Sequence, residues 1–243
     1  MKKQIVLLIG QPCSGKTTIS NFIKNFDEEE QYITFVTSKG IVKRTQAAEY
    51  KNIRQNGIIA INLKENDELI NVQITNGKKD LILGASNGKA IRFEEVQIRA
   101  TGRTSMGVRG MNVAAHESVV GVAFAENEKQ EVLVITEKGY GKRTEVSEYR
   151  NQNRGGKGVK TLQVKEKNGN LKNLKIVDDS KDLIVVTDKG VVIRTRINQI
   201  ASLKRVTQGV KIIRLKGEQK VSTIAVVPVN EIEENQDLRE EIE

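Results

Sequence analysis

The sequence predicts an all-β fold of about four similar four-stranded blades, preceded by a short strand–loop–helix segment. Three observations predict it. A unit of about 50 residues occurs four times, glycines mark equivalent turns in each copy, and the apolar residues are mainly Ile, Val and Leu. A four-stranded unit of this length has the size of a propeller blade. One blade cannot bury both of its faces, so neighbouring blades must pack together.

Each copy opens with a hairpin whose turn ends in glycine. The hairpins begin at Tyr32, Asp80, Glu131 and Asp182. Their turn glycines, which are 48, 51 and 51 residues apart, are Gly40, Gly88, Gly139 and Gly190. Glycine is expected there because a tight hairpin turn requires a positive φ.

A second glycine and a further strand complete each copy. The second glycines are Gly57, Gly107, Gly158 and Gly209. The further strands are predicted over Glu68–Ile74, Val119–Phe124, Leu171–Val177 and Val221–Val227. Together the copies predict a repeat domain over residues 31–229.

The composition and the charge limit the class of protein. The chain has 243 residues, of which 37% are apolar, and this suffices for a core. No apolar run reaches the roughly 18 residues of a membrane span. The single cysteine, Cys13, excludes an internal disulfide and suits a reducing cytoplasm, where we expect the protein to be located.

The net charge of +9 is unevenly distributed. Residues 31–230 carry +15, residues 1–30 are neutral, and residues 231–243 carry −6. A compact domain with this excess of positive charge attracts polyanions. Residues 230–243 are expected to form an acidic disordered tail, which either is a solvated end or competes with the polyanion for the basic surface.

Positive charge occurs at fixed positions of the repeat. An arginine follows each turn glycine by four residues, and a further arginine precedes each second glycine. Equivalent positions in stacked blades point the same way, so we predict a curved row of cations along one rim. The candidate contacts are Lys43, Arg44, Arg54, Arg92, Arg103, Arg109, Lys142, Arg143, Arg154, Lys157, Lys160, Arg194, Arg205 and Lys211. Alternatively, some of these residues protect edge strands from aggregation.

A regular row of cations suits the phosphates of double-stranded DNA. Proteins that bind single strands usually add aromatic platforms for base stacking, and aromatic residues make up only 4% of this chain. We therefore expect duplex binding with little sequence specificity and a preference for bent sites.

Four segments of the repeat stand out: GYGKRTEVSEYRNQNRGGKGVKT (Gly139–Thr161), NIRQNGIIAINL (Asn52–Leu63), GRTSMGVRGM (Gly102–Met111) and KRVTQGVKIIRL (Lys204–Leu215). They resemble the C-terminal domain of DNA gyrase A. The resemblance extends over about 200 residues. It implies a β-pinwheel, a propeller-like disc whose blades exchange strands and whose rim wraps DNA during negative supercoiling.

One loop resembles the gyrase box of that family, Q-R-R-G-G-K-G, with Asn153 in place of one arginine. Its residues are Gln152, Asn153, Arg154, Gly155, Gly156, Lys157 and Gly158. The family usually has six blades and carries its full box in the first. The four copies here resemble the last four, so this loop resembles the later, degenerate box.

The resemblance also implies partners and a division of labour. The parent family is an ATP-hydrolysing type II topoisomerase, so gyrase A and gyrase B are the expected protein partners. No association with a membrane is expected. The breakage–reunion domain with its tyrosine is missing from this sequence. We therefore expect no catalytic residue, no metal and no cofactor in the β module.

Residues 1–30 do not fit the repeat. A buried parallel strand expected over Gln4–Ile9, the loop GQPCSGKT and a helix over Thr18–Phe26 resemble the start of a P-loop kinase or NTPase. In a complete enzyme the loop would bind ATP and Mg²⁺ through Gly10, Gly15, Lys16 and Thr17. The further strands of such a domain are missing, so we interpret residues 1–30, with their acidic linker, as a fusion or truncation remnant.

Two alternatives stay open. The chain could be a P-loop nucleotide-dependent enzyme with an accessory β domain, or a propeller-like scaffold for protein interactions. A steep loss of DNA affinity with salt would favour DNA binding, and nucleotide binding that Lys16→Ala abolishes would favour the enzyme. The first copy has no preceding blade, so we also expect it to be prone to association.

Overall fold

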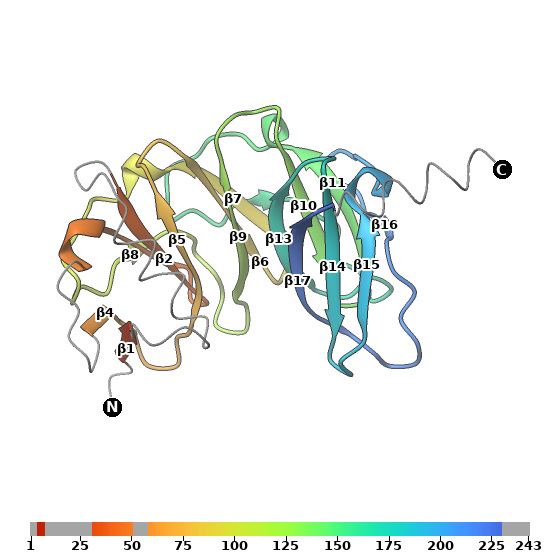
Figure 1. Ribbon diagram of the computed structural model, residues 1–243, viewed down its shortest axis with the longest axis horizontal. Coiled ribbons are helices and arrows are strands. Elements are labelled where there is room, and N and C mark those ends of the chain that lie inside the picture. Colours follow the sequence, from red (N-terminus) through yellow and green to blue (C-terminus); the bar gives the residue numbers. More distant parts are fainter. Residues whose placement is uncertain (1–3, 8–30, 51–57, 230–243) are drawn as a thin grey trace. The chain divides into compact units, whose positions relative to one another are not determined.

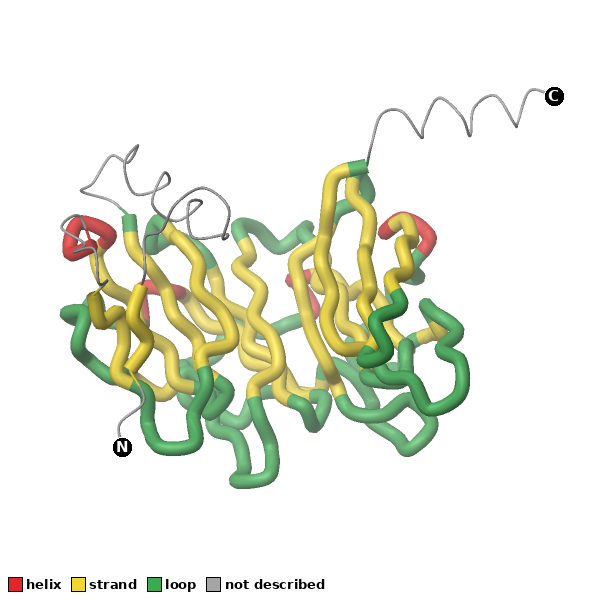
Figure 2. The backbone as a smooth tube through the Cα atoms, turned by 60° about the horizontal axis from the view of Figure 1, so that its bottom comes forward, coloured by secondary structure: helices red, strands yellow, loops and turns green. Residues whose placement is uncertain are grey.

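The computed structural model describes residues 4–7, 31–50 and 58–229. Helix in these residues is limited to short 3-10 turns, drawn in red in Figure 2: η1 (Ala47–Tyr50), η2 (Glu95–Gln97), η3 (Val146–Glu148) and η4 (Ile197–Gln199). No helix in this part of the chain is long and apolar enough to cross a membrane. The prediction of an all-β, propeller-like fold is confirmed.

The chain divides into two compact units, each assembled from separate segments. One unit comprises residues 1–85, 90–122 and 151–158, and the other comprises residues 86–89, 123–150 and 159–243. Each unit has an apolar core of its own. In the first, Ile33, Phe35 and Tyr50 pack with Ala60 and Ile61; the second has a cluster of residues from several strands, namely Leu133, Ile135, Val177, Leu183, Val185, Ile197 and Ile224.

The first unit contains the first hairpin and both strands of the second apart from residues 86–89 at its turn (Figure 1). Strands β2 (Tyr32–Thr37) and β3 (Ile41–Gln46) form the first, and the sheet order is β5-β2-β3-β8, with β5 at Leu69–Thr75 and β8 at Val108–Arg109. Strands β6 (Asp80–Ala85) and β7 (Lys89–Glu94) form the second, and β9 (Val119–Ala125) follows along the chain.

The second unit contains the third and fourth hairpins. The third lies in a sheet of order β13-β10-β11-β16, from β10 (Glu131–Thr136), β11 (Tyr140–Glu145), β13 (Leu171–Val177) and β16 (Val210–Lys211). The fourth lies in a sheet of order β15-β14-β17, from β14 (Lys181–Thr187), β15 (Val192–Arg196) and β17 (Val221–Pro228). Strand β12 spans Val159–Lys160.

The hairpins and their turns lie where the glycine spacing predicts them. The turn glycines adopt φ values of 75° to 78°, in the left-handed region that only glycine enters without strain. The four further strands predicted after the second glycines correspond to β5, β9, β13 and β17. The repeat pattern therefore predicted both the number and the places of the hairpins.

The fourth strand of a sheet comes from the following copy of the repeat. In the first unit β8 pairs with β3, with Val108 opposite Val42, although β8 follows the second hairpin in sequence. In the second unit β16 pairs with β11 in the same way, with Val210 opposite Gly141. The exchange of strands that the family resemblance implied is thus present in both units.

Strand β1 (Gln4–Leu7) differs from the expected parallel strand. It pairs antiparallel with β4 (Ile58–Asn62), with Leu7 opposite Ile58. Strand β4 is the first copy's counterpart of β8 and β16, so β1 occupies the place that the second strand of a hairpin takes elsewhere. The prediction of a parallel strand there is wrong, because the nearest unpaired strand edge belongs to the repeat.

Several predicted features lie outside the described residues. They are the P-loop residues Gly10, Cys13, Gly15, Lys16 and Thr17, the helix expected over Thr18–Phe26, Arg54, Gly57 and the tail over residues 230–243.

Candidate nucleic-acid interface

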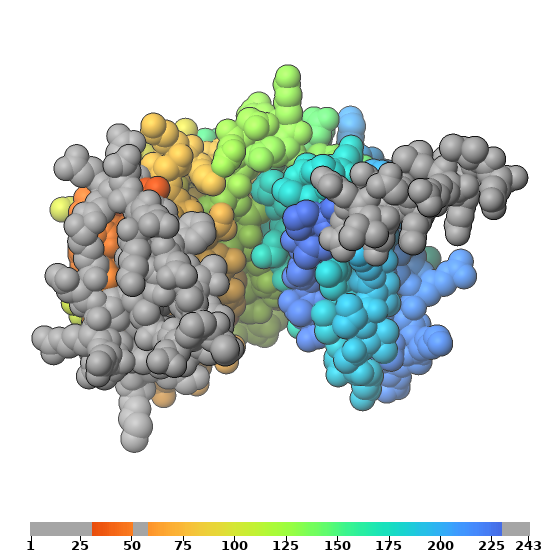
Figure 3. Space-filling view, in the orientation of Figure 1, coloured from red at the N-terminus to blue at the C-terminus, as the bar shows by residue number. Residues whose placement is uncertain are grey.

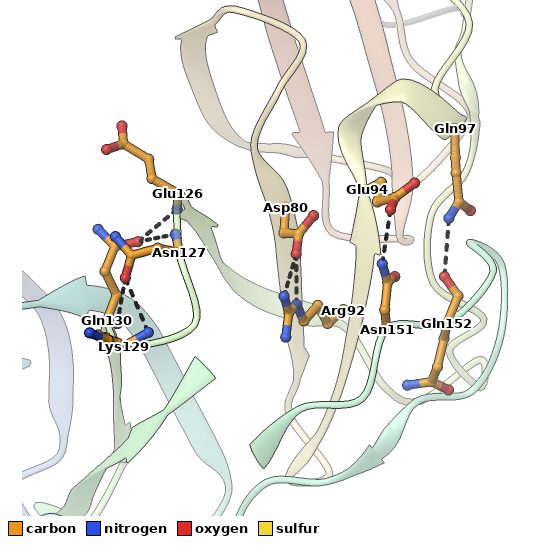
Figure 4. A network of polar contacts seen from close by, with 10 residues as sticks. All are labelled: Asp80, Arg92, Glu94, Gln97, Glu126, Asn127, Lys129, Gln130, Asn151 and Gln152. Carbon is orange, nitrogen blue, oxygen red and sulfur yellow. Dashed lines mark hydrogen bonds and ion pairs between the residues drawn. The ribbon is translucent and has the colours of Figure 1, made fainter. Parts of the chain in front are cut away.

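The four hairpin arginines do not form an exposed row. Arg44, Arg92 and Arg143 are only 7%, 7% and 9% exposed. Each hairpin arginine faces the residue twelve positions earlier, which is the first residue of its hairpin. That residue is Asp80 for Arg92 (2.7 Å, Figure 4) and Glu131 for Arg143 (2.8 Å).

The same diagonal contact occurs in the first and last hairpins. The Arg44 guanidinium lies over the Tyr32 ring, 4.3 Å from its centroid, and 3.8 Å from the buried Glu95 carboxylate. Arg194 bonds the Asp182 carboxylate at 2.6 Å, although its side chain is 32% exposed. The prediction of an exposed arginine row is wrong for Arg44, Arg92 and Arg143, because diagonal cross-strand pairing holds these side chains against the sheet.

Lys43 and Lys142, which precede two of these arginines, are fully buried. The Lys43 ammonium donates to the carbonyl oxygens of Ala60 and Arg103, and Lys142 donates to those of Lys204 and Arg205. Burial lowers the pKa of each lysine to about 8, and a neighbouring arginine adds to the effect. Their predicted placement on an exposed rim is therefore also wrong, since both ammonium groups bond to backbone carbonyls inside the fold.

The arginines before the second glycines hold the exchanged strands in place. Arg154 donates to the Arg109 carbonyl at 3.0 Å, and Arg205 donates to the Lys160 carbonyl at 2.8 Å. Arg103 makes the corresponding bond to the Ile59 carbonyl at 3.3 Å. Arg154 is exposed and the other two are half-buried, so each brings some positive charge to the surface while part of its guanidinium is engaged.

The loop that resembles the gyrase box is fixed by contacts within its unit. Gln97 donates to the Gln152 carbonyl at 3.2 Å, and Asn151 donates to Glu94 at 3.3 Å (Figure 4). The Gly155 amide, at a φ of 85°, donates to the Gly110 carbonyl. The loop is therefore held in one conformation and does not offer all its amides to a ligand. It still exposes Asn153, Arg154 and Lys157.

Other cations are exposed together at the turn ends of two blades. Next to the first hairpin turn, Lys39, Lys64 and Arg109 line a hollow that contains no acidic residue. Next to the third turn, the corresponding hollow is lined by Lys138, Tyr140, Lys167, Lys211 and Lys220, with Glu218 as its one acid. We call these two sites the turn-end hollows. Arg109 and Lys211 occupy equivalent positions on the exchanged strands β8 and β16.

The ammonium groups of Lys167 and Lys211 lie 5.8 Å and 5.5 Å from the centre of the Tyr140 ring. Such contacts hold long lysine side chains near one another at the surface without neutralising their charge. The hollow of the third blade therefore combines several positive charges with little negative charge, and this arrangement attracts phosphate groups.

Only part of the predicted set is exposed, as a contact to a ligand requires. The exposed members are Arg109, Arg154 and Lys157 in the first unit and Lys160, Arg194 and Lys211 in the second. Sequence reasoning missed Lys39, Lys64, Lys138, Lys167 and Lys220. A signal existed, because a lysine stands directly before the turn glycine at Lys39, Lys138 and Lys189.

Comparisons with known proteins agree with this arrangement. The sequence model of the family "DNA gyrase C-terminal domain, beta-propeller" matches residues 31–76, 79–126, 130–178 and 181–228. All four matches lie beyond residue 30, so none of them supports the P-loop interpretation.

Two relatives are named as the A subunit of DNA gyrase. The one from Staphylococcus epidermidis is 47% identical over 221 residues, which cover 90% of this chain and 24% of the relative. One from Staphylococcus aureus is 44% identical over 216 residues, which cover 88% of this chain and 24% of that relative. The chain therefore spans about a quarter of the length of these relatives.

Two solved structures resemble the fold. The C-terminal domain of a DNA topoisomerase IV matches with a TM-score of 0.79 at 26% identity, covering 84% of this chain and 64% of that one. A DNA gyrase A C-terminal domain matches with a TM-score of 0.74 at 21% identity, covering 86% of this chain and 74% of that one. With four family matches in register with its four hairpins, the chain belongs to the DNA gyrase A C-terminal domain family.

Proposed function

We propose that this chain binds the phosphate backbone of double-stranded DNA through its turn-end hollows and wraps it, as the part of a gyrase A protein that contributes to negative supercoiling. The observation that carries the proposal is the equivalent placement of exposed cations beside the first and third turns. Lys39 and Arg109 line one hollow, and Lys138 and Lys211 line the other. A repeated arrangement of this kind suits a ligand whose charges also repeat.

The chemistry of the hollows favours phosphate contacts over base reading. Their cations are mainly lysines, which act as point charges and bind phosphate without the planar pairing that arginine offers a base edge. We therefore infer weak sequence preference and a strong dependence on salt. Lys157, Lys160 and Arg154 are exposed on or next to the box-like loop and would add further contacts.

We infer that the described part of the chain acts without catalysing a reaction. Tyr50 and Tyr149 are fully buried, and burial raises the pKa of each to about 12. The Tyr149 hydroxyl is engaged with Thr161, and the Tyr50 hydroxyl donates to the Ala60 carbonyl. A buried phenol with a raised pKa is a poor nucleophile, which supports binding as the role of this module.

The expected partners are the remaining parts of gyrase A, together with gyrase B. Because the relatives are about four times as long as this chain, cleavage and ATP hydrolysis belong to other parts of such an assembly. A DNA partner also places the chain in the cytoplasm, with the nucleoid.

Salt titration of duplex binding tests the proposal. Lys39→Glu with Lys138→Glu should weaken binding at least tenfold and lower the slope of log affinity against log salt by about 2, since each phosphate contact contributes about 0.9. The matched control is Lys78→Glu with Lys129→Glu, which reverses two exposed charges that do not line either turn-end hollow. Equal losses in both double variants would refute a specific role for the hollows.

Wrapping is tested separately from binding. A nicked circular duplex that is sealed in the presence of the protein should show a change in linking number, and the control variant should retain that change. Tight binding that leaves the linking number unchanged would restrict the function to binding.

A further inference from the structure

The sheet of the fourth hairpin has three strands within the described residues, and β15 is one of its two edge strands. In the first hairpin the equivalent edge is covered by β8, so Ile41 and Val42 are 8% and 0% exposed. In the fourth hairpin the equivalent residues, Val191 and Val192, are 42% and 63% exposed. An apolar strand edge of this kind favours pairing with another strand.

Among the described residues, the fourth turn also lacks the contact that the exchanged segment makes elsewhere. The carbonyls of Gly40, Gly88 and Gly139 each accept two backbone N–H groups from the following copy. A Cβ atom added to these glycines would come within 2.4 to 2.9 Å of the carbonyl oxygens of residues Met111, Leu162 and Ile213.

At Gly190 such an atom would meet nothing within 4 Å, although φ is 77° as in the other turns. In Figure 3 this hairpin, in cyan, reaches the surface at its turn. In the part of the chain that the structure describes, the slot for a fourth strand is therefore formed and empty.

The three segments that fill such slots share a pattern. They read GVRGM, GVKTL and GVKII, starting from Gly107, Gly158 and Gly209, with a large apolar residue at the fifth position. The first copy contains GIIAI in the same place, and among the described residues its strand β4 pairs only with the four-residue strand β1. The described chain thus has one slot without its segment and one segment without a hairpin to receive it.

We propose that β15 of one copy of this chain accepts residues Ile58–Leu63 of a second copy as its fourth strand, which joins copies head to tail. By analogy with Val42 and Val108, Val192 would lie opposite Ile58. Ile61 would contact Gly190 as Met111 contacts Gly40. Main-chain hydrogen bonds along a strand edge supply the affinity in this mode of recognition.

The occupant is a second copy because the segment that fits is part of this sequence. Strand β1 would leave β4 on association, which is feasible because an isolated two-stranded pair is weak in water. The two surfaces in contact differ, so the association is heterologous and does not have to stop at a dimer.

Sedimentation velocity over a range of concentrations, at high salt and without DNA, tests the proposal. The unchanged chain should show a rising average mass. Val192→Lys should shift the association to at least about tenfold higher concentration, which corresponds to about 1.4 kcal/mol. The matched control is Val96→Lys, since Val96 is 64% exposed but lies in η2, outside the slot. A monomer at all concentrations, or equal effects of both substitutions, would overturn the proposal.

Disulfide formation tests the register. In a Cys13→Ser background, chains with Val192→Cys mixed with chains with Ile58→Cys should form mixed dimers on mild oxidation. Val96→Cys in place of Val192→Cys should form fewer. Dimers that join Val192→Cys to itself at least as readily would overturn the head-to-tail arrangement. A bond formed within single chains that carry both cysteines would show closure by the chain's own strand and would equally overturn it.

Discussion

The third and fourth hairpins follow the same pattern, EVLVITEKGYGKRT and DLIVVTDKGVVIRT, and yet their residues are buried to different extents. In the third, β16 covers the edge of β11 and the Arg143 side chain is 11% exposed. In the fourth, the Arg194 side chain is 32% exposed. The environment of a residue in this fold therefore depends on whether the next copy of the repeat completes its sheet.

The largest difference is expected between the two arginines. Arg143→Met should lower the free energy of unfolding by about 3 kcal/mol, because it removes the ion pair with Glu131 and the hydrogen bond to the Ile200 carbonyl. Arg194→Met should lower it by about 1 kcal/mol or less, since its pair with Asp182 is partly solvated. Urea denaturation measures both, and equal losses would contradict a role for residues 200–203 of the following copy in burying Arg143.

The turn glycines give a second comparison. Gly139→Ala and Gly190→Ala both place alanine at a φ of 77°, which costs about 1 kcal/mol. Only the first also forces a Cβ atom to within 2.7 to 2.9 Å of Ile213. We expect thermal unfolding to show an additional loss of about 1 to 2 kcal/mol for Gly139→Ala. If Gly190→Ala were the more damaging, the fourth turn would have a contact of its own.

The pH dependence of stability distinguishes Lys142 from its counterpart Ile193. The pKa of Lys142 is about 8 in the fold and 10.5 for an ordinary lysine. Between these values the unfolded chain binds more protons, so the free energy of unfolding rises with pH in this window. Lys142→Ile should remove up to about 2 kcal/mol of the rise between about pH 7.5 and 9.5. Tyr50 and Tyr149 have raised pKa values, so their titration lowers the free energy of unfolding, but only above about pH 10. An unchanged profile in the variant would place the titration on other groups.

The smallest effect on stability is expected at the turn lysines. Lys138→Gln and Lys189→Gln should each change the free energy of unfolding by less than about 0.5 kcal/mol, because both side chains are exposed. Lys138→Gln should nevertheless lower the salt slope of DNA binding by about 0.9. A large loss of stability in this variant would assign Lys138 to the fold instead of the interface.

The sequence predicted the architecture better than the interface. Turn glycines and runs of strand-forming residues are local signals, so the hairpins and the strands β5, β9, β13 and β17 could be placed from them. The burial of Arg92 and Arg143 depends on a carboxylate twelve residues earlier in the chain, at Asp80 and Glu131. That pairing becomes visible only when the two strands are placed side by side. The burial of Lys43 depends on the carbonyl oxygens of Ala60 and Arg103, which are 17 and 60 residues away in the sequence.

The exchanged strands have a consequence for protein synthesis. The carbonyl of Gly40 accepts hydrogen bonds from the amides of Gly110 and Met111, and that of Gly139 accepts them from Ile212 and Ile213. In both cases the donors lie about seventy residues further along the chain. On the ribosome each hairpin emerges long before the segment that completes its sheet. Contacts so distant in sequence slow folding, and a nascent chain is exposed to mispairing with its neighbours on the same messenger until the following copy of the repeat has been made.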